Sequence, residues 1–433
     1  MRAPSALKPS SLLLPLLPLI FVACGSGGDD SPAAGTAPQP SPPPAAQPDM
    51  LTATSQGILR GKANGQGQRL ILARPNLHQP AFSGDVFLAN GLVYYPREAP
   101  PVLFDYPNQD IWSVNTDGSG DHAVLNTGSD EFVTGVNPSY AIYNRGTYGG
   151  PNGRDDEWWS LRHNAGHALL TTERFAQYRF LAGDRAVFNT EHQLFSVNLN
   201  GSDARTHATA DNAGGTLMLE ASAVADGAVV FREHDFARAT VKAVPLSGGS
   251  VVSLDDGQAY ASYADHVGAR VVTQRCAIVL NDEGRPVAGP CDVVSVNTDG
   301  SGPVTLVSHP ANEAVQGIVG NQVMIRRNLS GNDQLIAVPV TGGAERLIMT
   351  MTDSEFVQLT TDDLLVIRRP SGTWTLDLNG TLKQIGIVNG EFGFIVVGNA
   401  YCLTRSGAPW CMPLDGQGQA VKIAETGRVL GAL

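Results

Sequence analysis

The segment 111–120 reads Ile-Trp-Ser-Val-Asn-Thr-Asp-Gly-Ser-Gly, and close copies of it return as far as the C-terminus. Each copy ends a short apolar alternation in a polar turn, such as Asn-Leu-Asn-Gly at 198–201 or Asp-Leu-Asn-Gly at 377–380. Asn, Asp and Gly tolerate the positive φ angles that short hairpin turns require. Each copy therefore predicts a strand, a tight turn and a second strand.

The residue just before the polar turn marks the spacing of these copies. Successive markers are 36 to 52 residues apart, with a mean of about 43, which is the period of four-stranded propeller blades. Two further short strands are expected ahead of each marker, most clearly at 178–182 and 186–189. The chain has 48 glycines and no long 3.6-residue apolar period, which favours an all-β fold. The eight markers are Val114, Leu161, Val197, Val244, Val296, Val338, Leu376 and Met412.

We therefore predict an all-β single β-propeller of about eight four-stranded blades, with seven to nine allowed. We name the strands of a blade A to D, from the axis outward. The hairpin at 58–72 lacks an A strand, and the chain ends in an orphan strand at 428–433, so we expect the two to share one blade that closes the ring. Counted literally the units give nine blades; because rings of nine are rare, eight is preferred.

The N-terminus has the pattern of an export signal. In residues 1–23, Arg2 and Lys8 are followed by an apolar run at 12–22 that is too short for an ordinary transmembrane helix. The run ends in Phe-Val-Ala-Cys at 21–24, which resembles the lipobox of bacterial lipoproteins. This resemblance implies a signal peptide over 1–23 and a lipid on Cys24.

The segment after the signal is a tether. Residues 24–50 are rich in Pro, Gly, Ser and Ala and poor in apolar side chains, so they are expected to be disordered, with the propeller over 51–433. Position 25 is Gly and not Asp. By resemblance to lipoprotein sorting signals, this implies that the protein is sorted to the outer membrane. We expect a monomer held at the membrane by its N-terminal lipid.

The charge and cysteine content narrow the partners and the compartment. A net charge of −12 disfavours nucleic acid and leaves proteins or glycans of the cell envelope as partners. Besides Cys24, four of the five cysteines form two local pairs, as expected for an oxidising compartment. A two-residue Ser-Gly turn places Cys402 opposite Cys411 at a non-hydrogen-bonded position, and Cys276 and Cys291 flank a turn near Gly284, so two disulfides are predicted.

No motif of a known catalytic site is present. Gly-x-Ser-x-Gly, His-Glu-x-x-His and a phosphate-binding loop are all missing from the sequence, and no cofactor is expected. His163 and His167 lack a third ligand, so a metal site there is disfavoured against two exposed histidines. The segment 115–121 has some character of a calcium loop but lacks the distal Glu, and a plain turn is favoured.

The most suggestive feature is the length of three B–C connections, at 96–108, 145–157 and 276–291, which should crowd one rim of the propeller. The first two are rich in aromatic and acidic residues, a composition that suits binding, although variable solvated loops would look the same. Trp158 is included among the predicted binding residues because it points to the opposite face of its strand from the core position Trp159. The predicted binding residues are Tyr94, Tyr95, Asp105, Tyr106, Tyr148, Asp155, Asp156, Glu157 and Trp158.

The units at 194–202 and 292–301 resemble the blades of TolB-like and WD-like propellers, and this resemblance covers most of 85–425. It implies a scaffold for interactions in the periplasm. The chain differs in having a lipid-attachment sequence and no α/β domain ahead of the repeats, so no Tol-system role and no functional residue is carried over. We predict a non-catalytic protein-interaction or ligand-binding module; the alternative is a glycan lyase or hydrolase with its site on the B–C face.

Overall fold

The structure is a computed structural model, and it describes residues 49–73, 86–99, 108–150, 153–163, 165–210, 217–235, 238–257, 260–280, 286–329, 332–386 and 392–433. The predicted signal peptide, Cys24 and the tether lie outside these residues, as do Asp105 and Tyr106. In the described part of the chain all regular elements are strands, and no helix there is long and apolar enough to span a membrane.

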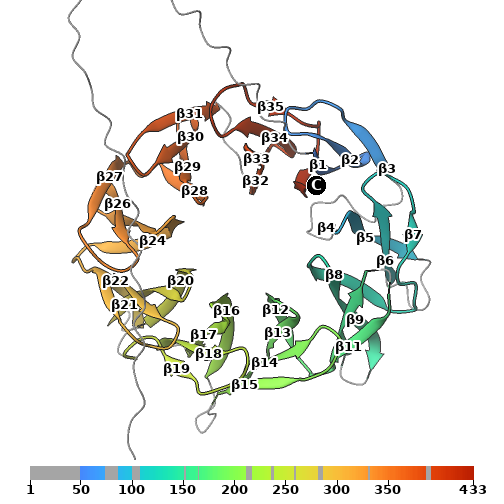
Figure 1. Cartoon of the computed structure of the whole chain (residues 1–433), viewed down its shortest axis with the longest axis horizontal. Helices are drawn as coiled ribbons and strands as arrows, with labels where there is room; N and C mark the ends of the chain where they lie inside the picture. Colours follow the sequence, from blue (N-terminus) through green and yellow to red (C-terminus); the bar gives the residue numbers. More distant parts are fainter. Residues whose placement is uncertain are drawn as a thin grey trace, which may run out of the picture. The chain divides into compact units, whose positions relative to one another are not determined.

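The strands form groups of four that follow one another around a central axis (Figure 1). The first five sheets, each given from the inside outward, use the following strands. They are β36 (Arg428–Ala432), β1 (Asp49–Thr54), β2 (Gly57–Lys62), β3 (Arg69–Ala73); β4 (Phe87–Ala89), β5 (Leu92–Ala99), β6 (Asn108–Asn115), β7 (His122–Ala123); β8 (Asp130–Val136), β9 (Tyr140–Gly150), β10 (Gly153–Arg162), β11 (His167–Thr171); β12 (Gln177–Ala182), β13 (Arg185–Asn189), β14 (Gln193–Asn198), β15 (Arg205–Thr209); and β16 (Met218–Ala225), β17 (Ala228–His234), β18 (Ala239–Pro245), β19 (Val252–Ser253).

The remaining sheets complete the ring in the same order. They are β20 (Tyr260–Val267), β21 (Arg270–Leu280), β22 (Pro286–Asn297), β23 (Val304–Val307); β24 (Asn312–Val319), β25 (Gln322–Asn328), β26 (Asp333–Pro339), β27 (Arg346–Met351); β28 (Phe356–Thr360), β29 (Leu364–Arg369), β30 (Gly372–Asp377), β31 (Leu382–Gly386); and β32 (Phe392–Val397), β33 (Ala400–Arg405), β34 (Ala408–Pro413), β35 (Val421–Lys422). The fifth and sixth sheets are linked by a single parallel pair, Ala239 and Tyr260.

The predicted all-β propeller is confirmed, and the described residues hold nine four-stranded units, one more than the preferred eight and within the allowed range. The closing unit is the predicted shared one. β36, the last strand of the chain, pairs antiparallel with β1, and β1 pairs with β2. β36 also contacts β32 on one side and β4 on the other. The first strand begins at Asp49, two residues before the predicted start of the propeller.

The repeated turns have a common structure that accounts for their sequence. In the turn at 115–119 the Gly118 N–H donates to the Asn115 carbonyl oxygen, and the Asp117 carboxylate accepts the N–H of Ser119. The turns at 198–202 and 297–301 repeat both bonds, and there the side chains of Asn200 and Asp299 accept the serine N–H. Each carboxylate or amide is thus used inside its own turn. This agrees with a plain turn and gives no support to a calcium loop.

The core lies between neighbouring sheets, because each sheet buries both faces against the next. Val187 and Val229 belong to one cluster, between the fourth and fifth sheets, whereas Phe188 belongs to another, with Ile142 of the third sheet. Successive residues of a B strand therefore point into two different clusters, and all five residues of β13 are buried. Alternation along such a strand does not separate a core side from a solvent side.

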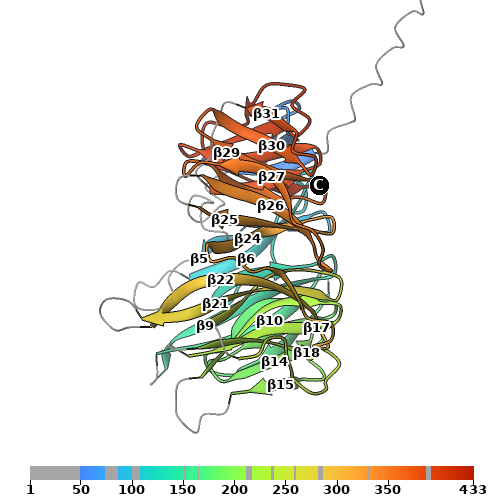
Figure 2. The same cartoon turned by 90° about the vertical axis from the view of Figure 1, so that its left-hand side faces the viewer.

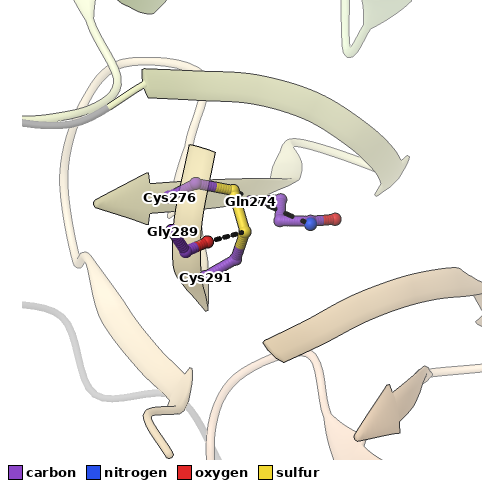
Figure 3. The surroundings of a disulfide bond; sticks show 4 residues. All are labelled: Gln274, Cys276, Gly289 and Cys291. Atoms are coloured by element: carbon purple, nitrogen blue, oxygen red, sulfur yellow. Dashed lines mark hydrogen bonds between the residues drawn. A yellow bond between two sulfur atoms is a disulfide. The ribbon is translucent and has the colours of Figure 1, made fainter. Parts of the chain in front are cut away.

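Both predicted disulfides are present in the structure. Cys276 and Cys291 are direct partners across β21 and β22, and Cys402 and Cys411 are partners across β33 and β34. The Cα atoms are 3.8 Å and 4.1 Å apart respectively, as expected for close cross-strand positions. Figure 3 shows the first bridge, with the Gly289 carbonyl oxygen 3.4 Å from the Cys291 sulfur. A disulfide sulfur carries no hydrogen, so this approach is a contact and not a hydrogen bond.

Candidate functional site

The B–C connections lie at one end of the channel, together with the connections that lead from each D strand to the next A strand. Of the three long connections predicted, two prove to be strand extensions: β9 pairs with β10 as far as Gly150 and Gly153, and β21 pairs with β22 as far as Leu280 and Pro286. Figure 2 shows these two hairpins extending on the same side of the ring. The connection between β5 and β6 lies outside the described residues.

Tyr94 and Tyr95 were predicted to belong to a binding surface, and this is wrong for both side chains. Each is 1% exposed on β5. Tyr95 packs in the cluster between the first and second sheets, and Tyr94 packs with Tyr143 between the second and third. Burial raises the pKa of Tyr94 to about 12. Its hydroxyl bonds to the Nδ1 atom of His163, so its polar end is also used internally.

Trp158 is partly buried and packs against the cluster between the third and fourth sheets. Its indole N–H donates to the Ala176 carbonyl oxygen at 2.9 Å, and its ring centroid is 5.7 Å from that of Phe188 and 6.0 Å from that of Tyr178. The parity argument fails because Trp158 and Trp159 face two neighbouring sheets, both of which cover them.

The other rim residues are only partly described. Asp156 is exposed, as a binding residue should be, whereas Glu157 is half-buried and accepts the indole N–H of Trp159 at 3.0 Å. Tyr148 and Asp155 lie on β9 and β10 at the expected end, but their side chains are outside the described set. The predicted rim patch thus keeps Asp156 as its one described and exposed member.

The two histidines near the third sheet contact different neighbours. The Nε2 atom of His163 lies 3.0 Å from the Asn137 carbonyl oxygen, and the Nδ1 atom of His167 lies 3.2 Å from the Tyr143 hydroxyl. Each ring is therefore engaged by a different neighbour. Within the described residues no group of three or more His, Cys, Asp or Glu side chains is arranged to hold a metal ion.

A buried Ser–His pair in the fourth sheet is structural. The Ser196 hydroxyl and the Nε2 atom of His207 share a hydrogen bond of 2.7 Å, and the Ser196 oxygen accepts the Nε–H of Arg185 at 2.8 Å. Both residues are buried, at 0% and 7% exposure, so no substrate reaches the hydroxyl. The network ties three strands of one sheet together.

A second group of polar side chains gathers where three A strands begin, and we call it the axial cluster: Arg179, Glu220, Arg232, His234 and Tyr260. β12, β16 and β20, which carry Arg179, Glu220 and Tyr260, lie nearest the axis in Figure 1. Arg232 and His234 are near the end of β17, which runs antiparallel to β16 and so ends where β16 begins. The cluster therefore lies at the B–C end of the channel and spans three successive sheets.

Glu220 is the centre of this cluster. One carboxylate oxygen accepts from Arg179 at 2.9 Å and the other from Arg232 at 2.6 Å, and Arg232 also reaches the Tyr260 hydroxyl at 3.5 Å. Partial burial would raise the pKa of Glu220, but the bonds and charges of the two guanidinium groups outweigh it and hold the pKa below its usual value. Glu220 is thus ionised at neutral pH and offsets one of the two positive charges.

His234 lies beside this group, with its Nε2 atom 4.0 Å from the Glu220 carboxylate. Burial, followed by the positive charge of Arg232, lowers the pKa of His234, so that the imidazole is neutral at pH 7. The side chains of Glu220, Arg232 and His234 are 39%, 24% and 16% exposed, so the cluster is partly open to solvent. Sequence reasoning missed these residues because they share no motif.

No protein-family model matches this sequence, and no curated protein does. Several solved structures resemble it. The β-propeller domain of the Trilobed protease from Pyrococcus furiosus is 10% identical, with a TM-score of 0.39 over 70% of this chain and 97% of that one. A putative TolB from Agrobacterium tumefaciens is 14% identical, with a TM-score of 0.30 over 51% and 84%.

A prolyl endopeptidase is 15% identical, with a TM-score of 0.39 over 69% of this chain, which spans 47% of that enzyme's length. At these identities the likeness concerns the fold and assigns no activity.

Proposed function

We propose that this protein is a lipid-anchored, extracytoplasmic β-propeller that binds a carboxylate-bearing ligand at the axial cluster. Export and anchoring are supported by the sequence around Cys24, where an apolar run meets Val-Ala-Cys. The two disulfides agree with an oxidising compartment outside the cytoplasm. The expected location is the outer membrane, with the tether over 24–50 giving the propeller reach.

The observation that carries this proposal is the surplus of hydrogen-bond donors at the channel mouth. Within the described residues, the Nη1 atom of Arg179 and the Nε atom of Arg232 donate to no other group. The Tyr260 oxygen accepts from Arg232, which leaves its own O–H to donate. Two guanidinium groups and one carboxylate leave one positive charge, and guanidinium groups bind carboxylates in a bidentate manner. The cluster therefore suits an anion.

The test is a titration calorimetry series with two acidic probes, a uronic acid trisaccharide and an acidic tetrapeptide, each paired with its neutral counterpart. We expect an acidic probe to bind and its neutral counterpart to bind at least about tenfold more weakly, a difference of about 1.4 kcal/mol. Arg179→Gln and Arg232→Gln should each reduce that preference. Arg346→Gln is the matched control, because Arg346 begins a D strand at the opposite end of the sheets. Equal binding of acidic and neutral probes contradicts the proposal.

One observation favours an enzyme as the second candidate. A neutral His234 beside Glu220 and Arg232 suits removal of the proton from a carbon next to a carboxylate. In a glycan lyase the glycosidic C–O bond at the adjoining carbon breaks in the same elimination, a C=C bond forms, and the leaving oxygen takes up a proton. Mass spectrometry of the uronic acid trisaccharide after prolonged incubation separates the two functions. An unsaturated product that disappears with His234→Ala, while binding persists, favours the lyase; an intact trisaccharide favours the binding module.

A further inference from the structure

Four blades carry a tryptophan at the same place, two residues before the marker residue of the repeat. In three of them another side chain of the same sheet lies near the indole ring. In the described part of the chain the fourth, Trp410, has no such ring or cation partner. The three covered rings are Trp112, with the Arg97 guanidinium 4.1 Å from its centroid; Trp159, stacked on Tyr143 at 6.5 Å; and Trp374, with the Arg369 guanidinium at 5.3 Å.

An arginine is nevertheless present at the corresponding place beside Trp410. Trp374 is the cross-strand partner of Ile367, and Arg369 follows two residues later. Trp410 is the partner of Leu403, and Arg405 follows two residues later. In the last sheet the guanidinium does not lie over the indole. Arg405 is exposed and makes no ion pair within the described residues.

Two cavities lie between neighbouring sheets. The first, of about 630 Å³, is at the seam between β36 and β4. The second, of about 550 Å³, is beside Trp410, between β31 of the eighth sheet and β34 of the ninth. The seam cavity is lined mainly by apolar side chains and backbone and carries no cluster of polar side chains. The cavity beside Trp410 is lined by Gln384, Ile385, Gly386, Arg405, Trp410, Gly418, Gln419 and Ala420.

The lining of this second cavity combines an apolar floor with a polar rim. Trp410 and Ala420 pack against the buried cluster that contains Ile385, so the floor is supported by the core. The Gln384 amide donates to the Ser371 carbonyl oxygen at 2.8 Å, which leaves its own carbonyl oxygen to accept. Gln419 and Arg405 are exposed, and their side chains have no hydrogen-bond partner within the described residues. Donors and acceptors thus line the same cavity as the indole of Trp410.

We propose that this cavity binds one pyranose ring of an oligosaccharide, stacked on Trp410. The C–H face of a pyranose is apolar and suits an indole, while the hydroxyl groups around its edge need partners such as amides and a guanidinium. The volume is within the range of roughly 300–1,000 Å³ that is usual for small-molecule sites. The aromatic side chain of a peptide would fit the floor but would offer the amides and the guanidinium of the rim no hydrogen-bond partners.

The site is separate from the axial cluster, and the experiment keeps the two apart. The protein carrying Arg179→Gln and Arg232→Gln, which lacks the proposed axial donors, is applied to an array of oligosaccharides. The best neutral and the best uronic acid ligand are then titrated by calorimetry. We expect at least one oligosaccharide to bind this background, and Arg405→Ala and Gln419→Ala each to weaken it about tenfold or more. A preference for the uronic acid ligand that Arg405→Ala abolishes shows that Arg405 binds the carboxylate.

Trp410→Leu is expected to abolish the stacking, and Trp374→Leu is the matched control at the covered position. Trp410 also packs against the core, so Trp410→Leu can reduce folding. Arg405 and Gln419 are exposed, and their variants test the site without disturbing the core. The proposal is overturned by an array without any binding. It is equally overturned if the Arg405 and Gln419 variants bind like their background, or if an aromatic tripeptide binds there and every saccharide fails.

Discussion

At the scale of single residues, Glu131 shows how the blade pattern places a carboxyl group where water does not reach. It is 0% exposed, its Oε1 atom accepts from the Thr127 hydroxyl, and its Oε2 atom has no partner within the described residues. The Arg145 guanidinium is 3.7 Å away, too far for a hydrogen bond. The equivalent pair in the seventh sheet, Glu313 and Arg327, is closer at 2.8 Å. Glu131 is thus the less well satisfied copy.

Burial raises the pKa of Glu131 to about 7, against the opposing effect of its bond to Thr127. The folded protein therefore keeps a proton that the unfolded chain has already lost above pH about 4.5, so stability falls as pH rises from there to about 7 and is level above. In Glu131→Gln this contribution is absent. We predict that the unfolding free energy of the variant then falls by up to about 3 kcal/mol less over the same pH range. Urea unfolding at several pH values measures it.

The control for this prediction is Glu173→Gln, at an exposed position of the loop before β12. It should leave the pH dependence of the unfolding free energy as it is in the original protein. If Glu131→Gln also leaves that dependence unchanged, the carboxyl group is hydrated and its pKa is ordinary.

At the scale of elements, the two disulfides allow loop length and packing to be compared. Chain entropy alone favours the Cys276–Cys291 bridge, which closes 15 residues against 9, by only about 0.5 kcal/mol. Cys402 and Cys411 are buried in a cluster with Met50 and Val429 of the closing sheet. Replacing both by Ala should cost about 2–4 kcal/mol, because packing is lost together with the bond.

The matched variant is Cys276→Ala with Cys291→Ala, on a hairpin that extends beyond the ring. It should cost at least about 1 kcal/mol less, because its neighbours Ile278 and Val279 are about 40% exposed and offer little core to disrupt. Thermal unfolding of both variants shows which pair of substitutions lowers stability more. A larger loss from the 276–291 pair means that loop length and not packing governs these bridges.

The elements also show what local sequence can and cannot reveal. The disulfide between Cys402 and Cys411 was predictable because a two-residue turn fixes the register by counting, and Ser406 and Gly407 indeed have φ values of 49° and 75°. Tyr94 was misassigned because it was grouped with the long B–C connection, whereas it lies inside β5. Trp158 was misassigned because parity was taken to separate core from solvent, whereas neighbouring sheets cover both faces. The axial cluster brings Arg179 and Tyr260 together across three sheets. No local sequence pattern indicates contacts between residues this far apart in the chain.

At the scale of the whole molecule, the ring depends on one seam, where β36 joins β1. Gly427, just before β36, has a φ of 129°, and a Cβ atom there would lie 2.0 Å from the Ala53 carbonyl oxygen in β1. Its N–H also donates to the Gly407 carbonyl oxygen of the ninth sheet. A side chain at this position must push β36 away from β1, and a seam that opens exposes the clusters on both of its sides.

We therefore predict that Gly427→Ala lowers the unfolding free energy by roughly 2–4 kcal/mol, a large effect for one methyl group. Gly128→Ala is the matched control, because a Cβ atom at Gly128 meets nothing within 4 Å and its φ is not in the left-handed region. Chemical unfolding measures both. Hydrogen exchange should show the loss first in β36 and β1, since an open seam exposes their ladder before the distant sheets unfold. Equal stability of the two variants means that the ring closes without the close contact at Gly427.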